Sequence, residues 1–246
     1  MAVLEKTIDI LGDDAFSSAL IARTMADGQP VDLYDEAIHH LRRFALYNMQ
    51  KIESVNFPNV TYCSGHSLQN CSSLKKVTME KCKTLSTEDL RNCPNLTEIN
   101  IPLLSSVGEY CFAGTGIETA NFPYLTSMYS YGTFSYCTSL KTVILPKLTI
   151  CGTNSFYHCT SLEQLDLPSI VNLYNGFATS CSNLKTVNLG PNLKTIAESA
   201  FSGTPEGLVI NLPISEGTIS GAPWGAANAV INYDTPYAGD VPIPES

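Results

Sequence analysis

The stretch that decides the fold runs from Phe156 to Ile170 and reads FYHCTSLEQLDLPSI. Its first apolar residues lie three positions apart and the last pair lies two apart: Phe156, Cys159, Leu162, Leu165 and Leu167. A spacing of two predicts a short strand with one buried face. Pro168 follows directly, and because proline lacks an N–H group it ends a strand at little cost. The stretch therefore predicts a corner followed by a short strand.

The same unit recurs along most of the chain. Its central leucine position falls at residues 52, 74, 96, 117, 140, 162 and 184, in steps of 21 to 23 residues. The copy that contains Ile117 lacks one residue. So regular a period is the signature of a solenoid, in which each coil buries its apolar face against the next coil. We therefore expect a β-rich solenoid of about eight coils of 21–23 residues.

The recurring unit Phe-x-x-Cys-x-x-Leu-x-x-Val-x-Leu-Pro resembles the BspA-like leucine-rich repeats, which occur in bacterial surface proteins and in prophage-encoded proteins. The resemblance covers roughly residues 38–213. Residues 222–233, APWGAANAVINY, look like the closing segment of phage-associated members. The resemblance implies a right-handed leucine-rich repeat solenoid of the α/β class that serves in binding, and it brings no catalytic residues and no cofactor.

The N-terminal part, residues 1–37, is expected to form a helical cap. Acidic residues open the segment 13–27, its apolar residues recur at helical spacing, and Gly28 follows at the place where a helix would end. A partner-binding helix is the alternative to a cap. Residues 32–43 are ambiguous between helix and strand, and we interpret them as the entry into the first coil.

The solenoid is expected to cover residues 38–213, and residues 214–246 are expected to form a C-terminal cap and an extended tail. Trp224 stands 23 residues after Phe201, so its indole is predicted to close the last coil. A strand around residues 229–233 is predicted to form the closing edge. The proline-bearing tail after it has no repeat spacing, which favours extended or mobile chain.

All nine cysteines fall on interior positions of the repeat: Cys63, Cys71, Cys82, Cys93, Cys111, Cys137, Cys151, Cys159 and Cys181. A free thiol at such a position acts as a small hydrophobic group. The odd count also favours buried, reduced thiols, although stacked neighbours such as Cys71 and Cys93 lie within reach of a disulfide. The sequence holds no CxxC or CxxH pair, so no structural metal site is expected.

Two outward columns of the repeat predict side-chain stacking from coil to coil. One column is rich in asparagine, at residues 56, 100, 121, 188 and 211, with Asp166 in the same position. The other alternates in sign at most coils: Glu53, Lys75, Thr97, Glu118, Lys141, Glu163 and Lys185. Opposite charges on neighbouring strands stabilise the pairing by about 0.2–1 kcal/mol per pair. Both columns are therefore expected to specify register.

Composition and motifs exclude several functions. A net charge of −9 and a pI of about 4.8 argue against nucleic acid, whose phosphates require clustered cations. The sequence has no HExxH, GxSxG, P-loop or GxGxxG motif, so we do not expect an enzyme. The carboxylate pairs Asp13-Asp14 and Glu88-Asp89 are expected to lie on solvated surface.

Residues 1–11 carry Glu5, Lys6 and Asp9, so they do not match a signal peptide. No apolar run approaches the roughly 18 residues of a membrane span, so no membrane insertion is expected. The sequence by itself fits a cytoplasmic location, whereas the resemblance implies the cell surface or a phage particle.

The candidate partner-binding residues are aromatic and occupy outward or loop positions of the middle coils: Tyr110, Tyr129, Tyr131, Tyr136, Tyr157, His158 and Tyr174. Tyrosine offers a large amphipathic surface, as binding surfaces favour. Packing between coils is the other interpretation of these rings. We expect a non-enzymatic leucine-rich repeat binding module that presents a solenoid face to a protein or glycan. The alternative is a structural or tail-associated protein of a phage or prophage particle.

Overall fold

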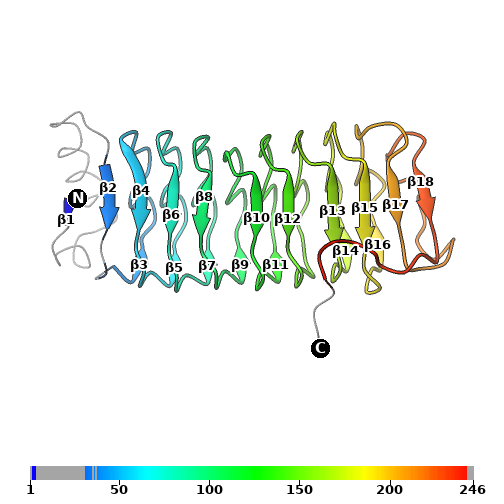
Figure 1. The fold of residues 1–246 in the computed structure, drawn as a ribbon, viewed down its shortest axis with the longest axis horizontal. Coiled ribbons are helices and arrows are strands. Elements are labelled where there is room, and N and C mark those ends of the chain that lie inside the picture. Colours follow the sequence, from blue (N-terminus) through cyan, green and yellow to red (C-terminus); the bar gives the residue numbers. More distant parts are fainter. Residues whose placement is uncertain (1, 4–30, 35, 37, 243–246) are drawn as a thin grey trace.

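The computed structural model describes residues 2–3, 31–34, 36 and 38–242, which form a β-solenoid of about nine turns (Figure 1). Each regular turn has a front strand, a short back strand and a third side that returns to the front. The front strands are β1 (Ala2–Val3), β2 (Val31–Tyr34), β4 (Ile52–Asn56), β6 (Lys76–Thr78), β8 (Glu98–Asn100), β10 (Thr119–Asn121), β12 (Thr142–Ile144), β13 (Gln164–Leu167), β15 (Thr186–Leu189), β17 (Val209–Asn211) and β18 (Val230–Asn232).

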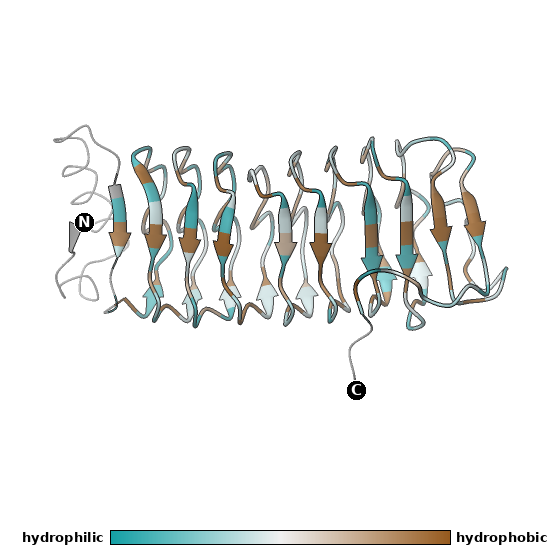
Figure 2. Ribbon diagram, in the orientation of Figure 1, coloured by the Kyte–Doolittle hydropathy of each residue, from teal (hydrophilic) through white to brown (hydrophobic). Residues whose placement is uncertain are grey.

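The back strands are only two residues long: β3 (His40–Leu41), β5 (Tyr62–Cys63), β7 (Thr84–Leu85), β9 (Ser106–Val107), β11 (Ser127–Met128), β14 (Asn172–Leu173) and β16 (Thr195–Ile196). Single bridges from Ile150 to Ser127 and to Asn172 join β11 to β14. All strand pairs are parallel, as expected when successive coils run in the same direction. Hydrophilic and hydrophobic residues alternate along the front strands (Figure 2), so one face of each strand is buried.

The front row is divided into three hydrogen-bonded sheets, in the orders β1-β2-β4-β6-β8, β10-β12 and β13-β15-β17-β18. The third side has no strands, but its backbone still forms a ladder between coils. Leu68 N–H donates to the carbonyl of Asp89 (2.8 Å), and Leu90 N–H donates to that of Cys111 (2.9 Å). The coils are therefore hydrogen-bonded on all three sides, but the front row is interrupted twice, between β8 and β10 and between β12 and β13.

The α/β class and the helical cap predicted for residues 1–37 are not supported. The helix expected at residues 13–27 lies outside the described residues, and no described residue is helical. In the same part of the chain β2 pairs with β1 and β4, because buried Leu33 lies between exposed Asp32 and Tyr34 in the alternation of a strand. The number of turns is about nine rather than eight, since β2 and β18 add coils that lack the repeat spacing.

The core is one continuous column of apolar side chains from the first described coil to the last. Phe134 is stacked between Phe112 and Phe156, at ring-centroid distances of 5.1 and 5.5 Å. Phe177 and Phe201 continue the column in edge-on contact. The predicted columns through a shared interior are therefore confirmed.

All nine cysteines are buried, as the repeat register predicted. The Cys71 thiol donates to the carbonyl of Leu46 (3.1 Å), and the Cys159 thiol donates in the same way to that of Phe134 (3.1 Å). Each bond ties a corner to the coil before it, which explains why a small side chain with an S–H donor suits this position. Burial raises the pKa of Cys71 and Cys151 to about 12 and that of Cys137 to about 11.

The predicted amide stacking forms over the last coils of the front face. Asn188 Nδ2 donates to Asp166 Oδ1 (2.7 Å), and Asn211 Nδ2 donates to Asn188 Oδ1 (2.6 Å). Asn232 extends the ladder by donating to Asn211 Oδ1 (2.7 Å). The ladder thus runs through four successive front strands and ends on a carboxylate.

The charge column forms three of the expected ion pairs: Glu53–Lys75 (2.8 Å), Glu118–Lys141 (2.9 Å) and Glu163–Lys185 (2.6 Å). These side chains are largely in solvent, so each pair stabilises the fold by at most about 1 kcal/mol. Their main effect is to favour one register of neighbouring coils over another.

The prediction of solvated surface is wrong for Asp89, which is only 1% exposed. Its Oδ1 accepts hydrogen bonds from Gly65 N–H and Ser67 N–H, both at 3.0 Å, and its Oδ2 accepts one from Ser86 N–H. The carboxylate therefore accepts hydrogen bonds from backbone N–H groups that would otherwise be unpaired in the turn from the back strands to the third side. Burial raises the pKa of Asp89, while these hydrogen bonds act in the opposite direction.

The C-terminal coil closes as predicted around Trp224, which is fully buried and donates its indole N–H to Ser220 O (2.8 Å). Strand β18 pairs with β17 as the closing edge. Residues 235–242 then turn back across the front face (Figure 1, red). Asp240 N–H donates to Asp166 Oδ2 (2.7 Å), and Val241 is buried, so the tail lies over β13.

Candidate functional site

Three of the candidate tyrosines stand where the back strands turn into the third side. Tyr129 follows β11 and Tyr174 follows β14, and strand alternation turns them outward because Met128 and Leu173 point into the core. Tyr131 lies two residues further along. The exposed fractions of Tyr129, Tyr131 and Tyr174 are 68%, 52% and 44%, which is high for large aromatic side chains.

These three tyrosines line a groove of about 370 Å³. Ile150, Cys151 and Gly152 contribute to its lining between the rings. A Cβ at Gly152 would lie 1.5 Å from Ser130 O, so the two coils approach each other here more closely than any side chain would allow. The groove is thus a defined hollow with aromatic walls.

Tyr136, Tyr157 and His158 form a second group at the other end of the third side. The ring centroids of Tyr136 and Tyr157 are 5.2 Å apart, and those of Tyr136 and His158 are 5.4 Å apart. A hydrogen bond with Tyr157 raises the pKa of the Tyr136 hydroxyl, with a smaller contribution from Tyr110. These phenols therefore lie close enough together to act as one polar and aromatic surface.

Tyr110 connects the second group to the N-terminal coils. The Arg91 guanidinium lies 4.9 Å from the Tyr110 ring centroid, a distance at which a cation interacts with an aromatic face. The ring itself rests on Gly132, where a Cβ would approach it to 2.3 Å. We call the seven predicted residues, arranged in these two groups, the tyrosine surface.

The backbone at Tyr136 and His158 is left-handed, with φ values of 60° and 59°. The third side requires this conformation, because Tyr136 N–H donates to Tyr157 O and His158 N–H to Thr179 O. Earlier coils place Asn70 and Asn92 at the same position, and asparagine tolerates this conformation best after glycine. The backbone therefore does not explain the aromatic residues, and such strain often marks a functional position.

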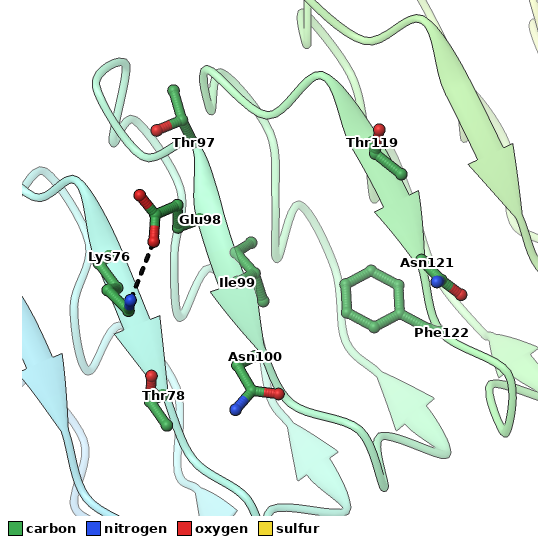
Figure 3. A pocket seen from close by; sticks show the side chains of 9 residues that line it. All are labelled: Lys76, Thr78, Thr97, Glu98, Ile99, Asn100, Thr119, Asn121 and Phe122. Atoms are coloured by element: carbon green, nitrogen blue, oxygen red, sulfur yellow. Dashed lines mark ion pairs between the residues drawn. The ribbon is translucent and has the colours of Figure 1, made fainter.

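A second hollow, of about 460 Å³, lies on the front face between β8 and β10 (Figure 3). We call it the front cleft. It is lined by Ile99 and Phe122 together with polar residues that include Lys76, Glu98 and Asn121. Sequence reasoning did not anticipate the cleft. The residue missing before Ile117 was the signal that could have located it.

The tyrosine surface offers stacking and hydrogen bonding rather than proton transfer or ligation. Phenolic hydroxyls both donate and accept hydrogen bonds, and the rings present apolar faces. Among the residues that the structure describes, no three His, Cys, Asp or Glu side chains are grouped so that they could hold a metal ion. Nor do the described residues include a helix with the length and apolarity of a membrane span.

A sequence model of the BspA type leucine rich repeat region matches residues 29–132 and 105–222, with six copies of the repeat. The chain belongs to the BspA-type leucine-rich repeat family. The resemblance seen in the sequence is therefore confirmed. Membership of the BspA-type family indicates a repeat-based binding or structural module, and no catalytic family is indicated.

Solved structures similar to this BspA-type chain come from several bacteria. A leucine-rich repeat protein of T. pallidum is 17% identical, with 78% of each chain covered and a TM-score of 0.48. A leucine-rich cell surface protein of Faecalibacterium prausnitzii is 20% identical, with 80% of this chain and 83% of that chain covered and a TM-score of 0.42. A leucine-rich repeat protein of Bacteroides ovatus is 16% identical over 83% of each chain, with a TM-score of 0.37. No curated protein sequence matches the chain.

Proposed function

We propose that this chain is a non-enzymatic binding module that holds a protein or glycan partner on its tyrosine surface. The observation that carries the proposal is the groove of about 370 Å³ walled by the exposed rings of Tyr129, Tyr131 and Tyr174. Aromatic side chains that are exposed around a hollow bury large apolar area on binding and lose little rotamer freedom. Packing between coils does not account for this arrangement, because packed rings would be buried.

Two features of the second group support the proposal. Tyr136 is 55% exposed although it makes ring contacts with two neighbours, so one face is free for a partner. Its ring is already held against Tyr157 and His158, which lowers the entropic cost of binding. The same proposal accounts for aromatic residues at positions with left-handed backbone conformation, where earlier coils have asparagine.

The alternative, a structural or tail-associated protein of a phage particle, rests on residues 222–233. In the structure these residues close the solenoid through Trp224 and β18. A solenoid needs such a closing segment in any context, since its last coil has no neighbour to cover it. The binding module is therefore our conclusion, and tail genes beside the coding sequence would favour the phage role instead.

The test compares variants on two arrays, one of glycans and one of extracellular proteins. BspA-like proteins are often surface-associated, which makes both classes appropriate. We expect Tyr131→Ala and Tyr174→Ala to weaken binding to the partner identified at least tenfold without lowering the midpoint of urea unfolding. Tyr124→Ala is the matched control, because Tyr124 is 50% exposed and lies outside the tyrosine surface. Unchanged binding by the first two variants would contradict the proposal.

A further inference from the structure

The break in the front row between β8 and β10 coincides with the missing residue before Ile117. In the preceding coil the corner closes with a turn, in which Leu96 N–H donates to Cys93 O (3.0 Å). Residues 115–117 form the next corner with one residue fewer, so this turn is not made. Gly116 instead lies against Pro94, where a Cβ would approach the carbonyl oxygen to 2.2 Å. The shortened corner then leads into β10, which pairs with β12 and not with β8.

The break opens the core column to solvent. Ile99 occupies the same register as Val77 and, one coil earlier, Val55. Both valines are fully buried, whereas Ile99 is only partly buried and lines the front cleft. Phe122 also lines the cleft (Figure 3) but is only 3% exposed, so Ile99 supplies the accessible apolar surface. A core position has therefore become an accessible apolar surface at the base of the cleft.

Both walls of the front cleft carry backbone groups without a strand partner. Alternate residues of a strand bond to one neighbour and the residues between them bond to the other. Glu98 N–H bonds toward β6 and Phe122 N–H bonds toward β12. Ile99 on β8, and Thr119 and Asn121 on β10, must therefore direct their N–H and C=O groups into the cleft. Unpaired strand edges of this kind are templates for another strand.

We propose that the front cleft is a docking site for one extended polypeptide segment, which runs between β8 and β10 and pairs its backbone with both strands. Its central apolar side chain covers Ile99, which is only partly buried. A polypeptide fits better than a glycan, because the walls offer donors and acceptors in strand alternation on both sides. The paired charges of Lys76 and Glu98 (3.0 Å) at the cleft favour a segment without net charge.

The tail of this chain shows that the front face accommodates extended polypeptide. Residues 235–242 lie across β13, with the Asp240 backbone bonded to Asp166 and the Val241 side chain buried. The tail occupies the later coils and leaves the front cleft uncovered. This second binding site is independent of the tyrosine surface, which lies on the third side of the coils.

The experiment closes the cleft and measures peptide binding. A displayed library of random dodecapeptides is selected against the whole chain, and the selected peptides are synthesised with a fluorescent label for anisotropy titration. The closed variant carries Thr115→Cys and one Asn inserted after Gly116, which restores the Cys-x-x-Leu spacing and lets β10 pair with β8. We expect its affinity to fall at least tenfold. Lys185→Ala, on the same face but remote from the cleft, should bind as the unaltered chain does.

Hydrogen exchange gives the second measurement. The amides of Ile99, Thr119 and Asn121 should exchange rapidly in the free chain, become protected with the peptide, and be protected throughout in the closed variant. If the closed variant fails to fold, Ile99→Glu replaces it and should likewise abolish peptide binding. Protection of these amides in the free chain, equal peptide binding by the closed variant, or a library that returns no peptide would each overturn the proposal. A glycan that binds the cleft where no peptide does would also overturn it.

Discussion

Asp89 provides the sharpest test of how the coils are held together. Replacing it by alanine removes the acceptor of three backbone N–H groups, and two of them, from Gly65 and Ser67, are buried. An unsatisfied buried donor costs about 1–3 kcal/mol, so two of them cost about 2–6 kcal/mol. The substitution also removes the unfavourable desolvation of the buried carboxylate, the effect that raises its pKa. We therefore expect Asp89→Ala to lose about 2–4 kcal/mol of unfolding free energy.

Urea unfolding followed by circular dichroism measures this loss, with the slope against urea checked for constancy. Glu98→Ala is the control, because Glu98 is an exposed carboxylate in an ion pair and its loss should cost no more than about 1 kcal/mol. A loss below about 1 kcal/mol for Asp89→Ala would refute the argument that backbone donors depend on this side chain.

The same carboxyl group predicts a pH dependence. Its folded pKa is raised above its unfolded value, so the folded chain binds the proton more tightly. The stability that this group contributes is then complete below the unfolded pKa of about 4 and is lost as pH rises through the folded pKa. Asp89→Asn keeps an acceptor for Gly65 and Ser67 but cannot titrate. The unfolding free energy that Asp89→Asn loses relative to the unaltered chain should therefore be larger at pH 4 than at pH 7. The opposite trend would show that folding lowers the pKa of Asp89 rather than raising it.

Three further predictions concern the core and the close contacts between coils. Phe134→Ala should lose about 3–5 kcal/mol in urea unfolding and Phe134→Leu clearly less, because the ring is stacked on both sides. No cysteine should react with a thiol reagent at pH 8 in the folded chain, whereas all nine should react in urea. The reason is burial, which raises the pKa of Cys71, for example, to about 12. Rapid labelling of the folded chain would be inconsistent with a buried column. Gly152→Ala should lose about 1–3 kcal/mol of unfolding free energy, because the added methyl would overlap Ser130 O. An unchanged urea midpoint would mean that the two coils separate freely.

The apolar columns could be predicted from the sequence because one residue type recurs at each interior position. Cys71 and Cys159, which are 88 residues apart, make the same bond to the preceding coil, and the period alone places them together. The asparagine ladder followed in the same way, since Asn188 and Asn211 share a register position. Where the same side chain repeats, its neighbours are copies of itself, and a one-dimensional pattern contains the three-dimensional contact.

The features that could not be predicted from the sequence depend on contacts that occur once and do not repeat from coil to coil. Asp89 has no counterpart with the same role in the repeat pattern, and its burial depends on N–H groups of other residues in three-dimensional space. The fold-back of residues 235–242 onto Asp166 has no periodic signal at all. The front cleft had a signal, the shortened corner before Ile117, but the consequence of one missing residue depends on how the corner packs against Pro94. The candidate tyrosines were identified as outward, yet their division into two groups required the coordinates.

Trp224 is the only tryptophan of the chain, and it lies in the coil that closes the C-terminal end. Its fluorescence therefore reports on one end of a structure in which the coils touch only their neighbours, apart from the tail that returns to β13. Circular dichroism averages over all coils, so a fluorescence transition that precedes the dichroism transition would record fraying from that end. The chain thus contains its own local probe of whether the solenoid melts as one unit or coil by coil.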